Sequence, residues 1–336
     1  MSEPTERQRE QVRAVVEWYL AVHHGDGSAP GLPAMYADRE QVGALAIDLE
    51  ALQQGEASAL FGALVTTAMF QRLRDVLVKS ILRRIPEELA ETLTDEHRLR
   101  ELADQSSCPA LRSTTSLRAD CDLRKDPETG RGSCSRAMPG GCHLHVHTEA
   151  LRRYGHFGKV PTSIALAVRE AGAADTAHLH ALALGQGSPA AAARWLEGTL
   201  SRAWRVSDKI AAMYCSLVSN PDIMPGAPWQ EGVDWRYFVV VDVNVDRYLA
   251  ATGYGGAGTY AARRRHVVEL ARGLDLSELR PGLEPDNPRL VQQALYLFMS
   301  ASNRAAAPED CSHEPARCAS CPRLVRELCP SRPDSA

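Results

Sequence analysis

Apolar side chains recur along most of the chain at the three- and four-residue spacing of an amphipathic helix. In residues 8–23 one such stripe is formed by Val12, Val15, Val16, Tyr19 and Leu20. The same spacing predicts helices over residues 38–53, 57–85, 86–104, 243–252, 258–273 and 288–301, and helical sequence resumes at Ser163. The pattern therefore predicts an all-α fold, and no internal repeat interrupts it.

Two helix starts in the second half of the chain carry their own signals. Ser188 stands before Pro189, and serine caps a helix while proline suits its first position. Ser207 is a second candidate N-cap and opens a helix that runs through Ser216. The apolar, β-branched run 237–241 predicts a buried extended segment that leads to Asp242.

Residues 106–158 differ from the rest because they show no sustained helical period and contain interspersed glycines and prolines. We expect an inserted loop held together by ligands. Its chemistry-bearing residues are Cys108, Cys121, Cys134, Cys142, His143, His145 and His147. The cysteines contain no CxxC pair, so the insertion is not a standard zinc ribbon. Two interpretations stay open: a zinc ion or second cluster held by these thiols, or four free thiols in a small core.

Composition narrows the class of protein. The chain has 336 residues, which predicts two domains, and 44% of them are hydrophobic. No apolar run is long enough to span a bilayer, and the first ten residues are polar, so we expect neither a membrane protein nor a secretory signal. Nine cysteines in such a chain favour metal ligands in a reducing cytoplasm over disulfides.

The charged residues bear on the expected partner and on the expected chemistry. The net charge of −4 argues mildly against a nucleic-acid partner, although a basic groove can be hidden in that average. Almost all of the 38 basic residues are arginines, and the lysines are Lys79, Lys125, Lys159 and Lys209. Arginine cannot lose its proton to act as a nucleophile, so each lysine is a candidate for chemistry.

The strongest local signal is the C-terminal series Cys311-x6-Cys318-x2-Cys321-x7-Cys329. Four thiolates at this spacing can hold a [4Fe-4S] cluster, and zinc would accept them equally well. The segment, with Glu314–Arg317 before its CxxC, resembles the cluster loop of endonuclease III-type DNA glycosylases. That loop has a last gap shorter by two residues. The resemblance implies a structural iron–sulfur cluster that positions basic residues at DNA phosphates, with Arg317, Arg323 and Arg326 as candidates.

A second segment, residues 241–247, resembles the helix start that carries the invariant aspartate of the helix-hairpin-helix glycosylase superfamily. The matching residues are Asp242, Asn244 and Arg247. Asp242 stands where an apolar run gives way to a helix, so its carboxylate can cap that helix. The resemblance implies that this carboxylate also accepts a proton or stabilises positive charge on a sugar, and that Asn244 and Arg247 contact DNA.

A third segment, residues 206–212, resembles the second half of the helix-hairpin-helix element, in which a lysine just inside the helix is the nucleophile. Lys209 has that place, and the positive end of a helix dipole disfavours the ammonium form there. The alternative for Lys209 is a snorkelling surface side chain. Arg205 and Ser207 stand where the family has two glycines that approach a phosphate, and Arg205 can supply charge to DNA instead.

The stretch between Lys209 and Asp242 is long, as in the archaeal 8-oxoguanine glycosylases, and this favours an oxidised purine as substrate. It contains Trp229 and Trp235, for which core packing and stacking on an extruded base are both open. A looser match places Gln71 at the helix turn that fills the space left by a flipped base.

Together these segments predict a two-lobed helix-hairpin-helix (HhH-GPD) glycosylase. Residues 1–56 would pack with the C-terminal lobe, 57–241 would form a helical barrel with the insertion, and 242–336 would carry the cluster loop. The expected partner is double-stranded DNA with a damaged base, bound by a monomeric, nucleoid-associated cytoplasmic enzyme. Lys209 would excise the base and nick the strand by β-elimination. The alternatives are a glycosylase in which Asp242 activates water, and a non-catalytic iron–sulfur protein that binds DNA or senses redox state.

Overall fold

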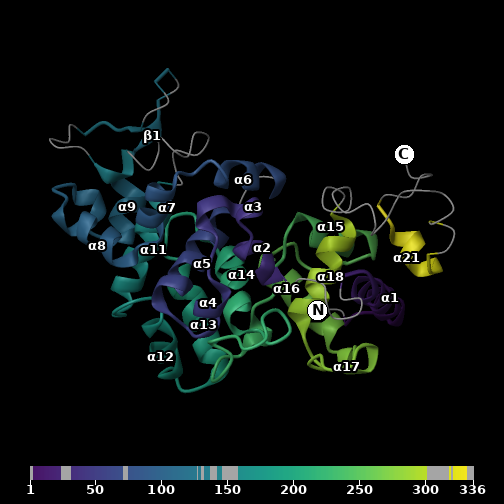
Figure 1. Ribbon diagram of the computed structural model, residues 1–336. Coiled ribbons are helices and arrows are strands. Elements are labelled where there is room, and N and C mark those ends of the chain that lie inside the picture. Colours follow the sequence, from purple (N-terminus) through teal and green to yellow (C-terminus); the bar gives the residue numbers. More distant parts are fainter. Residues whose placement is uncertain are drawn as a thin grey trace. The chain divides into compact units, whose positions relative to one another are not determined.

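The computed structural model describes residues 3–23, 32–70, 75–126, 128–129, 132–136, 142–145, 158–300, 318 and 321–330. These residues are mostly helical, which confirms the all-α fold class (Figure 1). Within them, no helix combines the length and the apolar character that crossing a membrane requires.

The chain divides into two compact units, each described here by itself. The terminal unit contains residues 1–30, 221–223 and 238–336, and the central unit contains residues 31–220 and 224–237. The sequence had suggested boundaries at residues 57 and 242. Residues 31–56 instead belong to the central unit, because their short helices pack on the helices that follow them.

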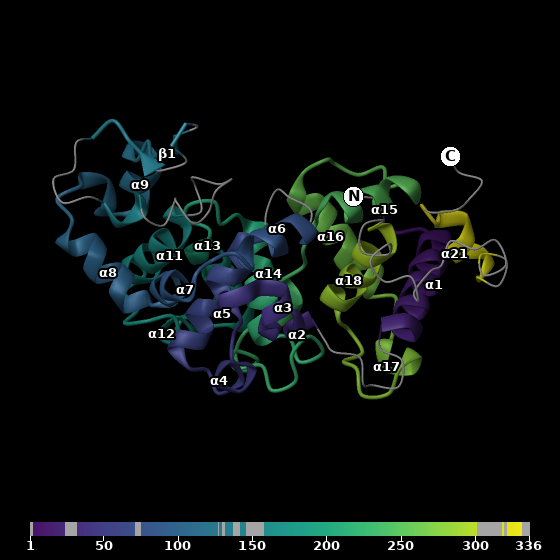
Figure 2. The ribbon, with the colours of Figure 1, turned by 45° about the horizontal axis from the view of Figure 1, so that its top comes forward.

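The central unit is built around helices that are apolar on nearly every face. Its helices are α2 (Leu32–Ala37), α3 (Arg39–Val42), α4 (Leu49–Gln53), α5 (Ala57–Met69), α6 (Asp75–Leu82), α7 (Glu87–Thr94), α8 (Glu96–Gln105), α9 (Thr114–Asp120), α11 (Lys159–Glu170), α12 (His178–Leu184), α13 (Pro189–Leu200) and α14 (Asp208–Ser219). α5 is buried along almost its whole length and contacts α14, α7 and α11 (Figures 1 and 2). An all-round apolar helix of this kind forms the centre of a core.

Three stretches that hydrophobic spacing predicts as single helices are divided in the structure. The stretch 38–53 is interrupted by the 3-10 turn Gly43–Leu45 and restarts at Asp48, which caps α4. Gly43 has φ +64°, and a Cβ there would lie 2.7 Å from the Arg83 Cα, so the backbones approach too closely for a side chain. The stretch 86–104 divides at Asp95, which is extended and accepts a hydrogen bond from the Arg98 N–H (2.8 Å). The stretch 57–85 divides between α5 and α6.

The insertion has more regular structure than its sequence suggested. It contains the 3-10 turn Pro109–Leu111, helix α9, and strands β1 (Arg124–Lys125) and β2 (Gly132–Ser133), which pair antiparallel. Ser113 caps α9 by accepting from the Ser116 N–H (3.0 Å). A helix of seven residues is too short for its periodicity to stand out, and this cap is the signal that could have revealed it.

The terminal unit joins segments from opposite ends of the sequence. Its helices are α1 (Glu6–His23), α15 (Val243–Ala251), α16 (Tyr260–Ala271), α17 (Leu276–Leu279), α18 (Pro288–Met299) and α21 (Arg323–Leu328). α18 is almost entirely buried and contacts α1, α15 and α16. Trp18 of α1 meets Phe298 of α18 edge to face, with ring centroids 5.3 Å apart. α1 also contacts α21 (Figure 2).

Candidate functional site

Lys209 lies at the start of α14, the second of two helices joined by a short turn. Ser188 caps α13 by accepting from the Ala191 N–H (3.2 Å), as predicted. α14 begins at Asp208, directly after Ser207, whose backbone is extended (φ −95°, ψ 171°). The Lys209 side chain is half-buried in the first turn of α14, where the helix dipole acts against a positive charge.

The first turn of α14 is not capped by its N-cap side chain. The Ser207 hydroxyl makes no capping hydrogen bond, and Ser201 Oγ instead donates to Asp208 Oδ1 (3.0 Å). Ser207 and Asp208 are both exposed. N–H groups in the first turn of a helix can bind an anion such as a phosphate when no side chain caps them.

The turn before α14 holds a non-glycine residue in the left-handed region. Arg205 has φ +65°, and in the described part of the chain it is the one residue other than glycine with a positive φ. An L-residue in this region costs about 1–2 kcal/mol. The Arg205 guanidinium lies 5.5 Å from the centroid of the Trp204 ring, and a cation–π contact offsets about 0.5–1 kcal/mol of that cost.

Substitution of Arg205 tests this backbone conformation. We expect Arg205→Gly to keep the melting temperature within a few degrees of the original, because glycine adopts a positive φ without strain. We expect Arg205→Val to be less stable than the glycine variant by about 2 kcal/mol, since a β-branched side chain tolerates this region worst. Chemical denaturation of both variants measures the difference, and equal stabilities would contradict a left-handed residue 205.

An arginine of the insertion donates hydrogen bonds to this same turn. Arg118 of α9 points its Nη2 toward three successive backbone carbonyls, those of Ser201 (3.4 Å), Arg202 (3.0 Å) and Ala203 (3.3 Å). The Trp204 backbone N–H also donates to Ser163 Oγ of α11 (2.8 Å). The backbone that precedes Lys209 is therefore fixed by groups from outside the turn.

Asp242 is the N-cap of α15, as its place in the sequence predicted. Its Oδ1 accepts from the N–H groups of Asn244 and Val245, both at 3.0 Å. Both capping bonds end on Oδ1, so the cap does not use Oδ2. The Asp242 side chain is half-buried. The carboxylate thus combines a fixed orientation with one oxygen that the cap leaves for another partner.

Other charged groups on α15 pair locally. Arg247 is exposed and donates to Asn244 Oδ1 (3.0 Å). Asp246 forms an ion pair with Arg263 of α16 (2.6 Å). Arg247 and Asn244, both predicted to contact DNA, are therefore held together on the first two turns of α15.

Trp229 and Trp235 are both buried in the central unit. The Trp229 ring stacks on His180, with centroids 5.8 Å apart, and meets Tyr214 edge to face at 5.6 Å. The Arg236 guanidinium covers the Trp235 ring at 4.1 Å. In this conformation both indoles pack as core side chains, which is the first of the two roles considered from the sequence.

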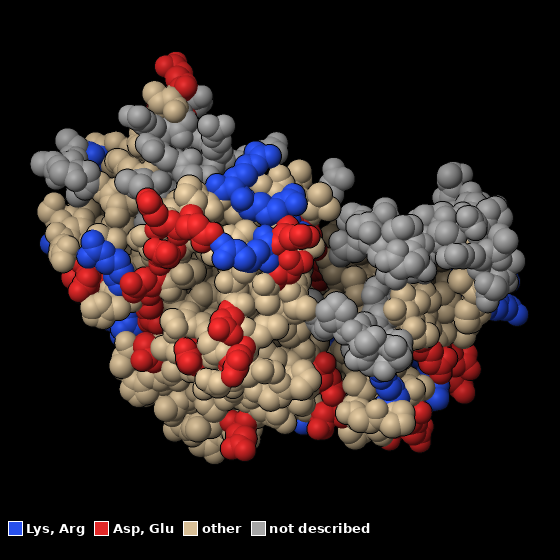
Figure 3. Space-filling model, in the orientation of Figure 1, with Lys and Arg blue, Asp and Glu red and all other residues tan. Residues whose placement is uncertain are grey.

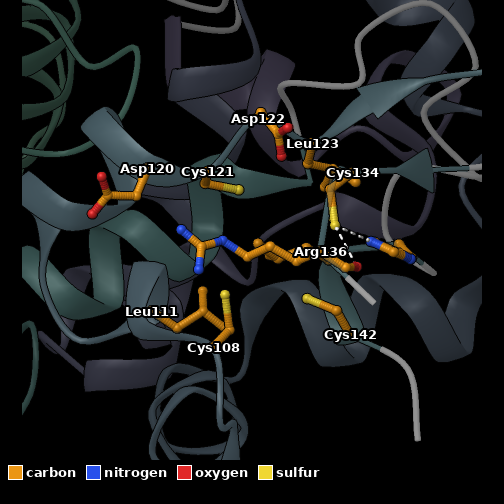
Figure 4. A pocket seen from close by; sticks show the side chains of 11 residues that line it. Cys108, Leu111, Asp120, Cys121, Asp122, Leu123, Cys134, Arg136 and Cys142 are labelled. Atoms are coloured by element: carbon orange, nitrogen blue, oxygen red, sulfur yellow. Dashed lines mark hydrogen bonds between the residues drawn. The ribbon is translucent and has the colours of Figure 1, made fainter. Parts of the chain in front are cut away.

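The four cysteines of the insertion line one pocket. Figure 4 shows the sulfur atoms of Cys108, Cys121, Cys134 and Cys142 pointing toward its middle, where the side chain of Arg136 also lies. All four are free thiols. As the described side chains stand, no group of three or more His, Cys, Asp or Glu residues closes on a single ion. The four thiols line the pocket, but their sulfur atoms do not converge on a single metal position.

The pocket is electrostatically unusual. Burial raises the pKa of the Cys142 thiol, and the neighbouring thiols of Cys108, Cys121 and Cys134 raise it further. Cys134 Sγ lies 3.4 Å from His145 Nε2. These effects disfavour the thiolate form of Cys142, whereas a bound metal favours the thiolate of a cysteine that ligates it.

Three of the four C-terminal cysteines fall within the described residues. Cys318, Cys321 and Cys329 are half-buried, and the Cys321 backbone N–H donates to the Cys318 carbonyl (3.3 Å). Helix α21 occupies most of the gap between Cys321 and Cys329. Three thiols of this kind suit a thiophilic centre such as a [4Fe-4S] cluster.

Several predicted site residues lie outside the described residues. These are Gln71, Cys311, Arg317 and His147. Their roles stay predictions.

Surface charge on the face of the molecule in Figure 3 is mixed. Basic side chains gather there over α3 and α6, beside a group of acidic ones. Arg39 of α3 pairs with Glu87 of α7, and Arg83, which follows α6, donates to the Glu40 carbonyl (3.5 Å). Arg39 and Arg83 therefore both make local contacts.

Sequence reasoning missed the roles of Lys159 and Arg118. Lys159 was noted only as one of a few lysines, yet its side chain is 1% exposed and its Nζ donates to the Cys121 carbonyl (2.5 Å). The rarity of lysine was the available signal. Nothing in the pattern marked Arg118, since an arginine near a helix end is usually solvated.

No protein-family model matches this chain, and no curated protein or solved structure matches it either.

Proposed function

We propose that this protein is a DNA glycosylase of the helix-hairpin-helix type with Lys209 as its nucleophile. The observation that carries the proposal is the left-handed Arg205 in the turn before Ser207 and Lys209. The resembling family has glycine at that place, and glycine is the residue that a left-handed turn favours. A left-handed residue at this place, here an arginine, supports the likeness to the family's turn at the start of α14.

The start of α14 suits DNA in two further respects. Its exposed first turn, which the Ser207 hydroxyl does not cap, offers N–H groups to a backbone phosphate. Arg205 places a guanidinium in the same turn, where it can pair with a second phosphate oxygen. These contacts would fix the duplex, while a damaged base would be extruded for excision.

The proposed reaction passes through covalent intermediates between Lys209 and the sugar. The neutral Lys209 amine attacks C1′ of the extruded nucleotide, and the glycosidic bond breaks with its electron pair leaving on the base. The attacking nitrogen loses a proton to a carboxylate, and the resemblance assigns that role to Asp242. The sugar ring then opens to a Schiff base. A C2′ proton is then lost to water, and the 3′-phosphate leaves with the electron pair of the C3′–O bond. Hydrolysis of the Schiff base releases the unsaturated aldehyde and restores the Lys209 amine.

The C-terminal cysteines would have a structural role in this proposal. Cys318, Cys321 and Cys329, with Cys311, would hold a [4Fe-4S] cluster that stabilises the segment around α21. No chemical step passes through it. An oxidised purine is the proposed substrate base, in double-stranded DNA.

Borohydride trapping tests the proposal directly. Duplexes carrying 8-oxoguanine, thymine glycol, uracil or an abasic site are incubated with the full chain and then reduced. We expect a covalent adduct with the abasic duplex, and with the 8-oxoguanine duplex if that base is excised. Base release without any adduct would favour water activation by Asp242. Neither release nor an adduct on any duplex would contradict a glycosylase and favour the non-catalytic DNA-binding protein.

A further inference from the structure

We infer that Cys108, Cys121, Cys134 and Cys142 bind a thiophilic metal centre, and that this centre sets the conformation of the turn before Lys209. The shared chemistry is tetrathiolate ligation, which suits a zinc ion or an iron–sulfur cluster. This site is separate from the C-terminal cysteines. The binding of a metal does not depend on the proposed function. Only the consequence that metal binding has for Lys209 rests on the proposed function.

The first argument is convergence. Cys108 precedes the turn 109–111, Cys121 follows α9, Cys134 follows β2, and Cys142 begins the turn 142–145. These are four different pieces of a segment with little regular structure, yet all four thiols line one pocket (Figure 4). Four cysteines brought together in this way across an irregular insertion are typical of a metal-held segment.

The second argument is the small size of the surrounding core. The apolar side chains that pack around the cysteines are few: Ala103, Ala110, Leu111, Leu117, Leu123, Leu144, Leu166 and the half-buried Trp204. An insertion with so little apolar area is hard to hold by burial alone. A metal–thiolate centre would supply the missing stability, because its binding free energy becomes folding free energy.

The third argument is a buried charge. Lys159, the first residue of α11, is 1% exposed, and its Nζ donates to the Cys121 carbonyl at 2.5 Å and lies 4.9 Å from the Trp204 ring centroid. Within the described residues no ion pair is found for it. A buried ammonium is costly unless opposite charge lies nearby. A zinc ion or a [4Fe-4S] cluster held by four thiolates carries a net negative charge. Lys159 would lie near that charge, because its Nζ donates to the backbone carbonyl of Cys121, one of the four ligand residues.

The surroundings provide an outer shell for such a centre. His145 Nε2 lies 3.4 Å from Cys134 Sγ, close enough to donate to a thiolate. Arg136 is exposed, so its side chain can turn outward when a centre occupies the pocket. Gly132 allows β2 to lie against the turn 142–145, since a Cβ there would be 2.9 Å from the His145 Cα.

The same groups connect the pocket to the turn before Lys209. Lys159 links the Cys121 backbone to the Trp204 ring, and Trp204 precedes Arg205 in that turn. Arg118, at the end of α9 that leads into Cys121, donates to the carbonyls of residues 201–203. Loss of the centre would therefore loosen both supports of the turn together.

The first test is metal content of the full chain, purified without oxygen. Cys121→Ser/Cys134→Ser should remove one centre, and Cys318→Ser/Cys321→Ser should leave it in place. Cys215→Ala, a buried cysteine of α14 outside both groups, is the matched control. Iron with acid-labile sulfide identifies a cluster, and zinc alone identifies a single ion. Unchanged metal and sulfide in the Cys121→Ser/Cys134→Ser variant would overturn the proposal.

A second variant keeps all four thiols and so avoids a simple folding failure. In the Cys318→Ser/Cys321→Ser background, Lys159→Met should weaken metal retention against a chelator by about 10–100-fold, as loss of an outer-shell partner does. It should raise the melting temperature of the metal-free protein, because an uncompensated buried charge is removed, and lower that of the loaded protein. If the melting temperatures of the metal-free and the loaded protein shift in the same direction, a metal does not compensate the charge of Lys159, and this argument is overturned.

The final measurement is hydrogen exchange of residues 201–208 in that background, before and after chelation. Reloading uses zinc alone in one sample and ferrous iron with sulfide in another. We expect the backbone amides of this segment to lose protection on chelation and to regain it with the native metal. Metal loss with unchanged protection would separate the centre from the turn and overturn the second half of the proposal. DNA activity enters none of these readouts.

Discussion

Alanine in place of Lys209 is expected to lower the yield of borohydride-trapped adduct on abasic DNA by on the order of 10³-fold or more, because the attacking amine is lost. Alanine is the best helix former, so α14 should keep its structure. Lys209→Arg should be equally inactive, since arginine keeps the charge but cannot form a Schiff base. The measurement is the rate of adduct formation with enzyme in excess over DNA.

Lys79 provides the matched control for this substitution. It lies in the last turn of α6, is half-buried like Lys209, and has no role in the proposal. Lys79→Ala should trap DNA at the original rate. An adduct of normal yield in the Lys209→Ala variant would show that another amine reacts, and the assignment of Lys209 would be wrong.

The second large effect is expected at Asp242, where one pair of variants separates chemistry from capping. Asparagine caps a helix as well as aspartate does, so Asp242→Asn should leave the melting temperature nearly unchanged. Its amide cannot accept the amine proton, so we expect base excision to fall by about 10²–10⁴-fold. Asp242→Ala should add a loss of about 1 kcal/mol in stability, because Asn244 and Val245 lose their capping acceptor.

Single-turnover base release and thermal unfolding of both variants give the two readouts. Asp275, which caps α17 by accepting from the Ser277 N–H (3.0 Å), serves as a control cap that the proposal does not use. Excision at the original rate by Asp242→Asn would leave Asp242 with a capping role alone.

Local signals in the sequence predicted what depends on a few neighbouring residues. The caps at Ser188 and Asp242 are of this kind, because a side chain and two or three backbone N–H groups determine them. The divisions at Asp95 and Gly43 were missed for the opposite reason: hydrophobic spacing averages over a helix and does not register one polar or left-handed residue within it.

The candidate sites differ in the same way: some features depend on neighbouring residues, and others depend on contacts between residues far apart in the chain. The four insertion cysteines had no recognisable spacing, since contacts among four irregular pieces of chain bring their thiols together. The buried Lys159 beside them could not be told from a solvated lysine until its neighbours were placed. The left-handed backbone at residue 205 could not be predicted from the arginine itself, because arginine is uncommon in that conformation. The indication that the sequence offered was the glycine that the resembling family has there.

The terminal unit is assembled from segments far apart in the sequence, and this has a consequence for synthesis on the ribosome. Arg9 of α1 donates to the Glu269 carbonyl, 260 residues later in the chain, and the apolar stripe of α1 lies against α18. The central unit can fold while the rest of the chain is still being made, whereas α1 emerges first and must wait for its partner. Until then Val12, Val15 and Val16 have no α18 to cover them, so a nascent chain stalled before residue 288 should be a preferred client of a chaperone.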